Sequence, residues 1–336
     1  MRAIVYEEAG GPEVLRLVDR PVPEPGPGEV RVRVVVSGVN PTDWKSRAGT
    51  TPSDPQVPDQ DGAGVVDAAG DGTAYAVGDR VWIWDAAWQR PDGTAQELVV
   101  LPQRQVVALP DDASFDLGAS LGIPALTAHL ALRAGDASAA PLAPGALTGR
   151  TVLVAGGAGA VGHAAIELAV WAGARVLTTV SSPQKAALAR AAGAHEVVDY
   201  RAEDATARIR ALAPDGVHLV AEVNPNANAA LDAAVLVNGG TVAVYATDTP
   251  EPLALDVRPN MGANVSWRFL LTYTAPRGEK EAALAGVRAA VQAGALRTGE
   301  AAGLPITRFP LERTADAHRA VEDSTVGKVL IDVTPA

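Results

Sequence analysis

The chain has 336 residues, of which 48% are hydrophobic and 20% charged, with a formal net charge of −11 and no cysteine. That length is enough for two domains with separate cores, and the hydrophobic fraction excludes a disordered chain. The acidic balance, with only four lysines among 28 basic residues, indicates no nucleic-acid partner and no anionic membrane partner. Without cysteine, the chain forms no disulfide, iron–sulfur cluster or cysteine-ligated zinc site. Residues 1–8 carry no signal-peptide pattern and no apolar run is long enough to span a membrane, so we expect a cytoplasmic protein.

The first third of the chain has the pattern of short strands. Strand-like runs occur at residues 30–36, 64–66, 79–84 and 96–100. Turn clusters rich in proline and glycine, such as residues 23–28, separate them. Short strands at close spacing predict a compact β-barrel.

From residue 151 the pattern changes to alternating strands and helices. Strands are predicted at 151–155, 175–180, 196–200, 218–223 and 240–245, with helices at 161–172 and 183–192 between the first of them. This alternation predicts an open parallel sheet. After about residue 265, a helix at 280–293 and two strand-like segments, the last at 329–333, are predicted to return to the first domain. Residues 134–149, rich in alanine, proline and glycine, are predicted to form a surface loop.

A glycine motif follows the first strand of this alternating region and opens the next helix. It reads Gly157-Ala158-Gly159-Ala160-Val161-Gly162. In that context the bare backbone can approach a pyrophosphate, which the helix N-terminus favours. The pattern therefore predicts a dinucleotide site; the alternative is a glycine-rich turn that binds nothing.

The residues after the second strand indicate which dinucleotide is bound. An NAD site places a carboxylate there, whereas this chain has Ser181, Ser182 and Lys185. Hydroxyls and an ammonium attract the 2′-phosphate of NADPH, and Tyr200, after the third strand, can lie near the same ribose. The alternative is a solvated first helical turn with an incidental lysine.

Two other motifs are not assigned a chemical role. Ser120 lies in a G-x-S-x-G match, but no apolar strand precedes it as a hydrolase nucleophile requires, so it is interpreted as part of a helix start. His163 and Glu167 are one helical turn apart, but a single pair does not make a zinc site.

Five segments, taken in order, resemble the medium-chain dehydrogenase/reductase superfamily. They are residues 38–45, 61–66, 77–81, 121–128 and 327–330. Within that superfamily the chain is most similar to the zinc-free, zeta-crystallin-like quinone oxidoreductase branch. The resemblance implies an α/β protein with a GroES-like β-barrel catalytic domain (1–124 and 265–336) and a Rossmann domain with a doubly wound parallel sheet (125–264). It also implies a homodimer.

The resemblance assigns roles to individual residues. Gly157, Gly159 and Gly162 match the family's dinucleotide glycines, and Ser181, Lys185 and Tyr200 its 2′-phosphate residues. Its remaining cofactor contacts fall on Asn40, Thr127, Tyr245, Ala246, Phe269, Leu270 and the Lys328 of the closing motif. Zinc-dependent relatives carry a His-Glu pair where this chain has Gln60-Asp61, so no metal is expected.

One departure from the family concerns the source of the proton that an enone takes up next to the carbon that receives the hydride. Many relatives carry a tyrosine where this chain has Trp44, whose indole N–H is not a useful acid. We hypothesise that water delivers the proton and that Trp44 forms a wall of the substrate pocket. Asp43 and Lys45, on either side of it, are expected to point to solvent. Asn40 and main-chain amides near Thr127 are predicted to stabilise charge on the substrate carbonyl oxygen.

The tryptophans offer a further indication of a substrate surface. Trp82 and Trp84 share one strand face and form either barrel core or an aromatic wall for a flat substrate.

Together these features predict an NADPH-dependent, metal-free oxidoreductase that transfers hydride to a small planar quinone or α,β-unsaturated carbonyl. One alternative is a polyketide-type enoyl-thioester reductase, which runs the same chemistry on a longer thioester. The other is an NADPH-binding protein with a structural or regulatory role.

Overall fold

A computed structural model describes residues 1–136 and 140–335. Its contacts divide the chain into two compact units. The first unit contains Met1–Ile123 and the C-terminal segment from Pro305, and the second unit is Pro124–Leu304. Among the described residues, no helix is long and apolar enough to cross a membrane.

The first unit is built on a mixed sheet around one long strand, β3 (Glu29–Val39). The sheet has the order β14-β15-β3-β4-β5-β7, and β6 also pairs with β3. Its other strands are β4 (Asp61–Ala69), β5 (Arg80–Ile83), β6 (Leu98–Pro102), β7 (Val106–Ala108), β14 (Ile306–Pro310) and β15 (Lys328–Asp332). A separate pair, β1 (Arg2–Val5) and β2 (Arg16–Asp19), is antiparallel. Valines of β3 alternate into the core with those of β4 and β6, as half-buried strands require.

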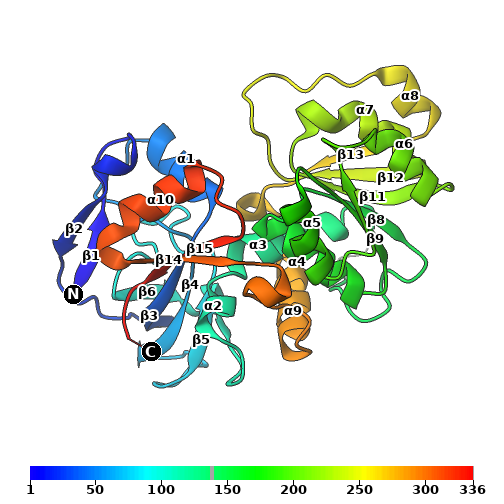
Figure 1. Cartoon of the computed structure of the whole chain (residues 1–336). Helices are drawn as coiled ribbons and strands as arrows, with labels where there is room; N and C mark the ends of the chain where they lie inside the picture. The colour runs from blue at the N-terminus through cyan, green and yellow to red at the C-terminus, as the bar shows by residue number, and fades with distance from the viewer. Residues whose placement is uncertain (137–139, 336) are drawn as a thin grey trace. The chain divides into compact units, whose positions relative to one another are not determined.

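Strand register brings distant polar residues to one end of β3. Gly38 pairs with Asp61 of β4, and Val39 pairs with Val329 of β15. Helix α1 (Pro41–Gly49) starts immediately after β3, with proline at its first position and Asn40 as its N-cap. Helix α10 (Thr314–Glu322) packs on both α1 and β15 (Figure 1). Residues from both ends of the chain therefore surround Asn40.

The second unit contains the predicted parallel sheet, with strand order β10-β9-β8-β11-β12-β13. Its strands are β8 (Thr151–Ala155), β9 (Arg175–Val180), β10 (Glu196–Asp199), β11 (Val217–Glu222), β12 (Leu236–Val244) and β13 (Ser266–Phe269). Its helices are α3 (Gly122–Leu132), which begins at the unit boundary, α4 (Ala160–Trp171), α5 (Pro183–Ala191), α6 (Ala205–Leu212), α7 (Pro225–Val235), α8 (Val257–Gly262) and α9 (Arg277–Gln292). Figure 1 shows α4 and α5 on one face of the sheet and α6 and α7 on the other. The strand order reverses between β8 and β11, and ligands of such sheets bind at the carboxyl ends beside that point.

The division of the chain differs from the prediction at the C-terminal side. Residues 265–304 were assigned to the first domain, but they belong to the second unit. The reason is β13, which pairs in parallel with β12 over Ser266–Phe269 and extends the sheet by one strand. A run of four residues is too short for its apolar alternation to predict a strand.

The segment predicted as a surface loop, 134–149, includes residues 137–139, which lie outside the described residues. Its later part is not confined to the surface. Leu142 is buried, and its N–H donates to His129 Nε2 at 2.9 Å. Leu142 thus packs in the second unit, and the buried imidazole of α3 accepts from its main-chain N–H.

The first helix and the ends of several elements were not predicted. Helix α1 lacks a strong apolar stripe, strands β1 and β2 have only four residues each, and β2 is largely exposed. Tertiary packing rather than local pattern stabilises these elements.

Candidate functional site

The glycine segment lies at the carboxyl end of β8, where α4 begins. A Cβ added at Gly157 would lie 2.2 Å from Thr178 Oγ1, and one at Gly162 would lie 2.3 Å from the carbonyl oxygen of Gly156. Both positions therefore need glycine so that β8, β9 and α4 can pack closely. At Gly159 the nearest atom to such a Cβ is 3.6 Å away, so space remains in front of the helix N-terminus. An anionic group fits that space, beside the N–H groups of the first turn of a twelve-residue helix.

The three residues predicted for the 2′-phosphate lie together in the second unit. Lys185 Nζ donates to Ser181 Oγ at 3.1 Å, one turn into α5 from the end of β9. Tyr200 follows the neighbouring strand β10, and its N–H donates to the carbonyl oxygen of Val180 at 3.1 Å. The tyrosine side chain is 50% exposed, so its hydroxyl can reach a ligand. Lys185, Ser181 and Tyr200 thus lie at the ends of two adjacent strands.

A pocket of about 280 Å³ opens at the ends of β12 and β13. All four residues predicted for the nicotinamide side, Tyr245, Ala246, Phe269 and Leu270, line it. The Leu270 N–H donates to the carbonyl oxygen of Val244 at 2.8 Å, which holds the two segments side by side. Thr127, on α3, is buried, and its hydroxyl is 2.6 Å from that of Thr272.

In the first unit, Asn40 is the centre of a buried polar network. Its Nδ2 donates to Asp61 Oδ2 at 2.8 Å, and its Oδ1 accepts from Lys328 Nζ at 2.7 Å. Its main-chain N–H donates to Asp43 Oδ2 at 2.6 Å. The other amide hydrogen of Asn40 has the carbonyl oxygen of Gly38 at 3.4 Å. The polar groups of Asn40 are thus engaged within the unit, and the network holds the turn between β3 and α1.

The charges of this network are shifted by burial. Lys328, Asp61 and Asp43 are all buried, and Lys328 Nζ lies 3.6 Å from Asp61 Oδ2. Burial raises the pKa of Asp61 to about 6, although the Lys328 ammonium opposes it. Burial and the neighbouring carboxylates of Asp59 and Asp61 raise the pKa of Asp43 well above its usual range. Burial likewise lowers the pKa of Lys328. Asp43 was predicted to point to solvent, and this prediction is wrong: its side chain is buried, and burial disfavours its charged form.

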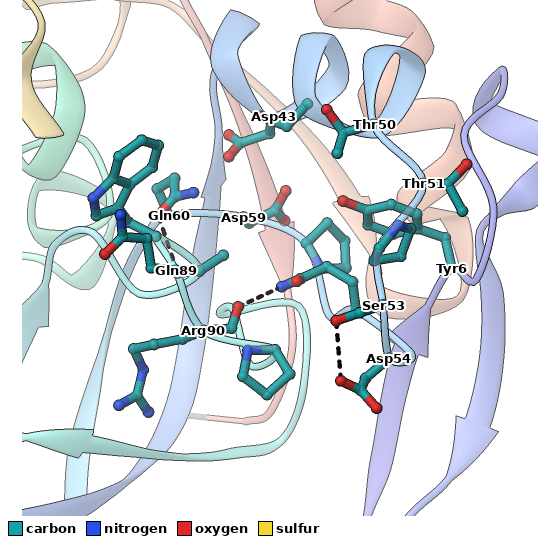
Figure 2. Close-up of a pocket in the computed structure, with 17 residues that line it drawn as sticks. Tyr6, Asp43, Thr50, Thr51, Ser53, Asp54, Asp59, Gln60, Gln89 and Arg90 are labelled. Carbon is teal, nitrogen blue, oxygen red and sulfur yellow. Dashed lines mark hydrogen bonds between the residues drawn. The ribbon is translucent and has the colours of Figure 1, made fainter.

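A second pocket, of about 620 Å³, lies in the first unit beside this network. Figure 2 shows its lining, with Asp43 above Asp59, Gln60 on one side of them and Tyr6 on the other. The lining residues are Tyr6, Asp43, Ser46, Thr50, Thr51, Pro52, Ser53, Asp54, Gln56, Pro58, Asp59, Gln60, Ala87, Trp88, Gln89, Arg90 and Pro91. Its volume is in the range of small-molecule sites, about 300–1,000 Å³.

Comparison with known proteins agrees with both units. The model of the alcohol dehydrogenase GroES-like domain matches residues 26–111, and that of the zinc-binding dehydrogenase domain matches residues 160–287. The quinone oxidoreductase of Lama guanicoe is 31% identical over 98% of this chain and 97% of its own length.

Solved structures show the same fold over the full chain. An NAD-dependent alcohol dehydrogenase has a TM-score of 0.86 at 30% identity, covering 99% of this chain and 100% of its own. A mycobacterial protein solved in complex with NADPH has a TM-score of 0.80 at 32% identity, covering 98% of this chain and 99% of its own.

The chain belongs to the quinone oxidoreductase family of medium-chain dehydrogenases/reductases. It is thus an oxidoreductase with a GroES-like domain and a Rossmann domain, as the sequence predicts.

Gln60 and Asp61, the pair compared above with the His-Glu pair of zinc-dependent relatives, have hydrogen-bond partners within the first unit. Gln60 Oε1 accepts from the Ala87 N–H at 3.0 Å. Asp61 Oδ1 accepts from the Ile123 N–H at 2.8 Å, and its other oxygen accepts from Asn40. Within residues 1–136 and 140–335, no group of three or more histidine, aspartate or glutamate side chains could hold a metal ion.

The tryptophans of the first unit differ in their surroundings. Trp82 and Trp84 are buried, with exposures of 0% and 7%, and so belong to the core. Trp88 lines the larger pocket, whereas Trp44, half-buried on α1, is not among its lining residues. The predicted role of Trp44 as a pocket wall stays a prediction.

The two motifs that were not assigned a role have structural partners. Ser120 Oγ donates to the carbonyl oxygen of Asp116 at 2.7 Å, after the short helix α2 (Phe115–Gly118). His163 Nε2 lies 3.1 Å from Glu167 Oε2 and 3.0 Å from the carbonyl oxygen of Arg297. These contacts stabilise the packing of each unit.

Several buried titratable residues carry no motif and were not predicted. Glu222, the last residue of β11, and Asp232 of α7 are both fully buried. Burial and the Glu222 carboxylate raise the pKa of Asp232 to about 9, so protonated Asp232 can act as a hydrogen-bond donor toward Glu222.

Tyr6 and Asp59 of the larger pocket were also missed, because single residues in turns have no pattern. Only their residue types could have suggested a role, since aspartate and tyrosine are seldom buried without a polar partner or function.

Proposed function

We propose that this chain is an NADPH-dependent oxidoreductase that transfers hydride to a quinone or an α,β-unsaturated carbonyl without a metal. The observation that carries the proposal is the position of Lys185, Ser181 and Tyr200 at the ends of β9 and β10, next to the glycine segment. An ammonium and hydroxyls suit the 2′-phosphate, which is the group that distinguishes NADPH from NADH. The family's quinone oxidoreductases and the mycobacterial relative solved with NADPH support the same choice.

The second unit fits this cofactor. The open space at Gly159 and the N-terminus of α4 suit the pyrophosphate, and the pocket that Tyr245 and Phe269 share with their neighbours suits the nicotinamide side. When bound, NADPH supplies the hydride. The residues of this chain bind and orient the reactants, which is the protein's main contribution in cofactor enzymes.

The 620 Å³ pocket of the first unit is our candidate for the substrate site. Trp88 provides an aromatic surface for a flat molecule, and Gln60 and Asp43 provide polar groups in the wall. The absence of cysteine and the internal hydrogen bonds of Gln60 and Asp61 support a reaction without zinc. As the family resemblance implies, we also propose that the protein is a homodimer, which sedimentation measures directly.

The test is a substrate panel assayed by NADPH consumption. Simple quinones and short enones should be reduced, and acyclic enoyl thioesters should be reduced far more slowly. Turnover of enoyl thioesters alone would assign the protein to the polyketide-type reductases. Tight NADPH binding without turnover of any member of the panel would favour a structural or regulatory role.

A further inference from the structure

Tyr6 is the one tyrosine in the lining of the larger pocket, and it comes from the N-terminal end of the chain. It follows β1 directly and is held by two main-chain hydrogen bonds with Gln56, at 3.0 and 2.9 Å. Its side chain is only 6% exposed. Figure 2 shows the ring entering from the wall and the hydroxyl directed toward the middle of the pocket, on the side of Asp59. The phenol is therefore fixed in position before any ligand arrives.

The hydroxyl of Tyr6 makes no hydrogen bond with another side chain or carbonyl in the part of the chain that the structure describes. A buried tyrosine usually satisfies its hydroxyl within the protein. Even the half-buried Tyr75 of the same unit does so, by donating to the carbonyl oxygen of Val106 at 2.7 Å. The Tyr6 hydroxyl is thus available to a molecule in the pocket.

The charges around Tyr6 keep it a donor. Burial, and then the carboxylates of Asp43 and Asp59, raise the pKa of Tyr6 to about 12, against the opposing guanidinium of Arg47. The hydroxyl consequently retains its proton throughout the neutral range. Of the two carboxyl groups, Asp59 is paired with His318 Nε2 at 3.0 Å and accepts from Ser37 Oγ at 3.0 Å. Asp43 accepts from the Asn40 N–H at 2.6 Å, and burial raises its pKa well above the usual range.

Two residues that line the same pocket have a strained backbone. Asp59 and Gln89 have φ values of +76° and +54°, in the left-handed region that residues with a Cβ rarely adopt. Both line the pocket. Strain of this kind costs about 1–3 kcal/mol per residue and collects at functional sites, where the surrounding structure maintains it.

From this geometry we infer that the Tyr6 hydroxyl donates a hydrogen bond to the carbonyl oxygen of the quinone or enone. The inference rests on the proposed function. Hydride addition to a conjugated carbonyl leaves negative charge on that oxygen, and a fixed donor stabilises the charge more than it stabilises the neutral substrate. Tyr6 thereby supplies a phenol, from the segment that follows β1, in a chain that has Trp44 at the position compared with the relatives' tyrosine.

The first test measures binding without the cofactor. 4-Nitrophenolate carries its negative charge on an oxygen attached to a flat ring, and its absorbance reports the environment of that oxygen. Tyr6→Phe should weaken its binding by about 10- to 150-fold, the usual effect of a hydrogen bond to a charged group. 4-Nitroanisole, which has the same ring without the oxyanion, should bind both proteins equally. Equal nitrophenolate affinity in the two proteins, or no saturable binding to the wild type, would overturn the inference.

The second test measures turnover and stability. Tyr6→Phe should lower kcat for quinones by about 10²–10³-fold, as the loss of one oxyanion donor does, and leave the Kd for NADPH unchanged. Its Tm should not fall, because the lost hydroxyl has no partner in the described chain. The matched control is Tyr75→Phe, which should lower Tm and keep kcat.

The outcomes separate the inference from the proposed function. A kcat of Tyr6→Phe within twofold of wild type contradicts the inference, and so does a fall in Tm as large as that of Tyr75→Phe. If the wild type reduces no quinone or enone but Tyr6→Phe still weakens nitrophenolate binding, the donor role stands and the proposed function fails.

Discussion

The two units hold their polar groups in different ways. In the second unit, the features that suit the phosphates of a dinucleotide come from the glycine segment and from strand ends within one short stretch, residues 157–200. In the first unit, the network around Asn40 and the pocket beside it join residues 6, 59, 61 and 328, which meet only through strand register and helix packing. Main-chain recognition at a helix N-terminus is a local property of the sequence, whereas a network of buried charges exists only in the folded chain.

The difference extends to energetics. Buried ionised groups in the first unit depend on each other, because removing one leaves another uncompensated in a medium of low polarity. In the second unit, Lys185 is half-buried at the surface and can be lost without harm to the core. Substitutions in the first unit should therefore affect folding most, and those in the second unit should affect ligand binding most.

The largest effect is expected for Lys328→Met. It removes the cation from Asp61 and Asn40 and should lower the free energy of unfolding by about 3–5 kcal/mol at pH 8, measured by urea denaturation. The loss should be smaller at pH 5, because Asp61, whose pKa is raised to about 6, takes up a proton and loses its charge. Lys45→Met, at an exposed lysine of the same unit, should change stability by less than about 0.5 kcal/mol. Equal stability of the two variants would show that the network does not depend on Lys328.

Lys185→Ala tests the ligand side of the comparison. It should weaken NADPH binding by about 10- to 150-fold, or about 1.5–3 kcal/mol, and leave NADH binding and Tm nearly unchanged. Titration calorimetry with both cofactors measures the difference. The control is Lys280→Ala in the same unit, whose ammonium donates to the carbonyl oxygen of Tyr273 at 3.1 Å and lies on a different segment. Equal losses for NADPH and NADH would remove Lys185 from the 2′-phosphate site.

Two glycines of one motif should respond differently to alanine. Gly162→Ala places a Cβ 2.3 Å from the Gly156 carbonyl oxygen and should destabilise the unit by about 1–3 kcal/mol. Gly159→Ala meets no atom within 3.5 Å and should keep the wild-type Tm, but weaken NADPH binding on the order of tenfold, about 1.4 kcal/mol. If Gly159→Ala binds NADPH as the wild type does, the space in front of α4 is not the pyrophosphate site.

Asp232→Asn should change how stability depends on pH. The pKa of Asp232 is raised from 3.8 to about 9, so between these values the folded chain keeps a proton that the unfolded chain releases. Stability of the wild type therefore falls as pH rises through this window, by up to about 1.4 kcal/mol per pH unit from this group. The variant, whose amide can donate to Glu222 at every pH, should lack this slope. Asp215→Asn, at an exposed aspartate of the same unit, should keep the wild-type slope; a wild-type slope in Asp232→Asn would contradict the raised pKa.

The smallest effect is expected from chelators. Since Gln60 and Asp61 are engaged in internal hydrogen bonds and no cysteine is present, dialysis against a chelator should leave NADPH-dependent activity unchanged. Elemental analysis of the purified protein provides the check. Stoichiometric zinc that is lost together with activity would refute a metal-free reaction.

Much of the second unit could be predicted from the sequence because its signals are local. Alternating apolar runs and helical periodicity predict β8 to β12, and the glycine spacing places the cofactor segment at the end of β8. The grouping of Lys185 with Ser181 and Tyr200 follows from the adjacency of β9 and β10 in a parallel sheet. The exceptions were β13, which is only four residues long, and Leu142, whose burial depends on α3.

The first unit shows what only the tertiary structure decides. Its short strands could be predicted, but their register could not, and the register brings Asp61 and Lys328 to Asn40. Asp43 was expected in solvent, yet the packing around α1 buries it and raises its pKa. Tyr6 had no pattern at all. The sequence by itself determined the periodic elements and the main-chain ligand motif, since both depend on neighbours along the chain. The folded structure decided which side chains are buried together and which hydroxyl faces the pocket, because burial and charge coupling depend on neighbours in space.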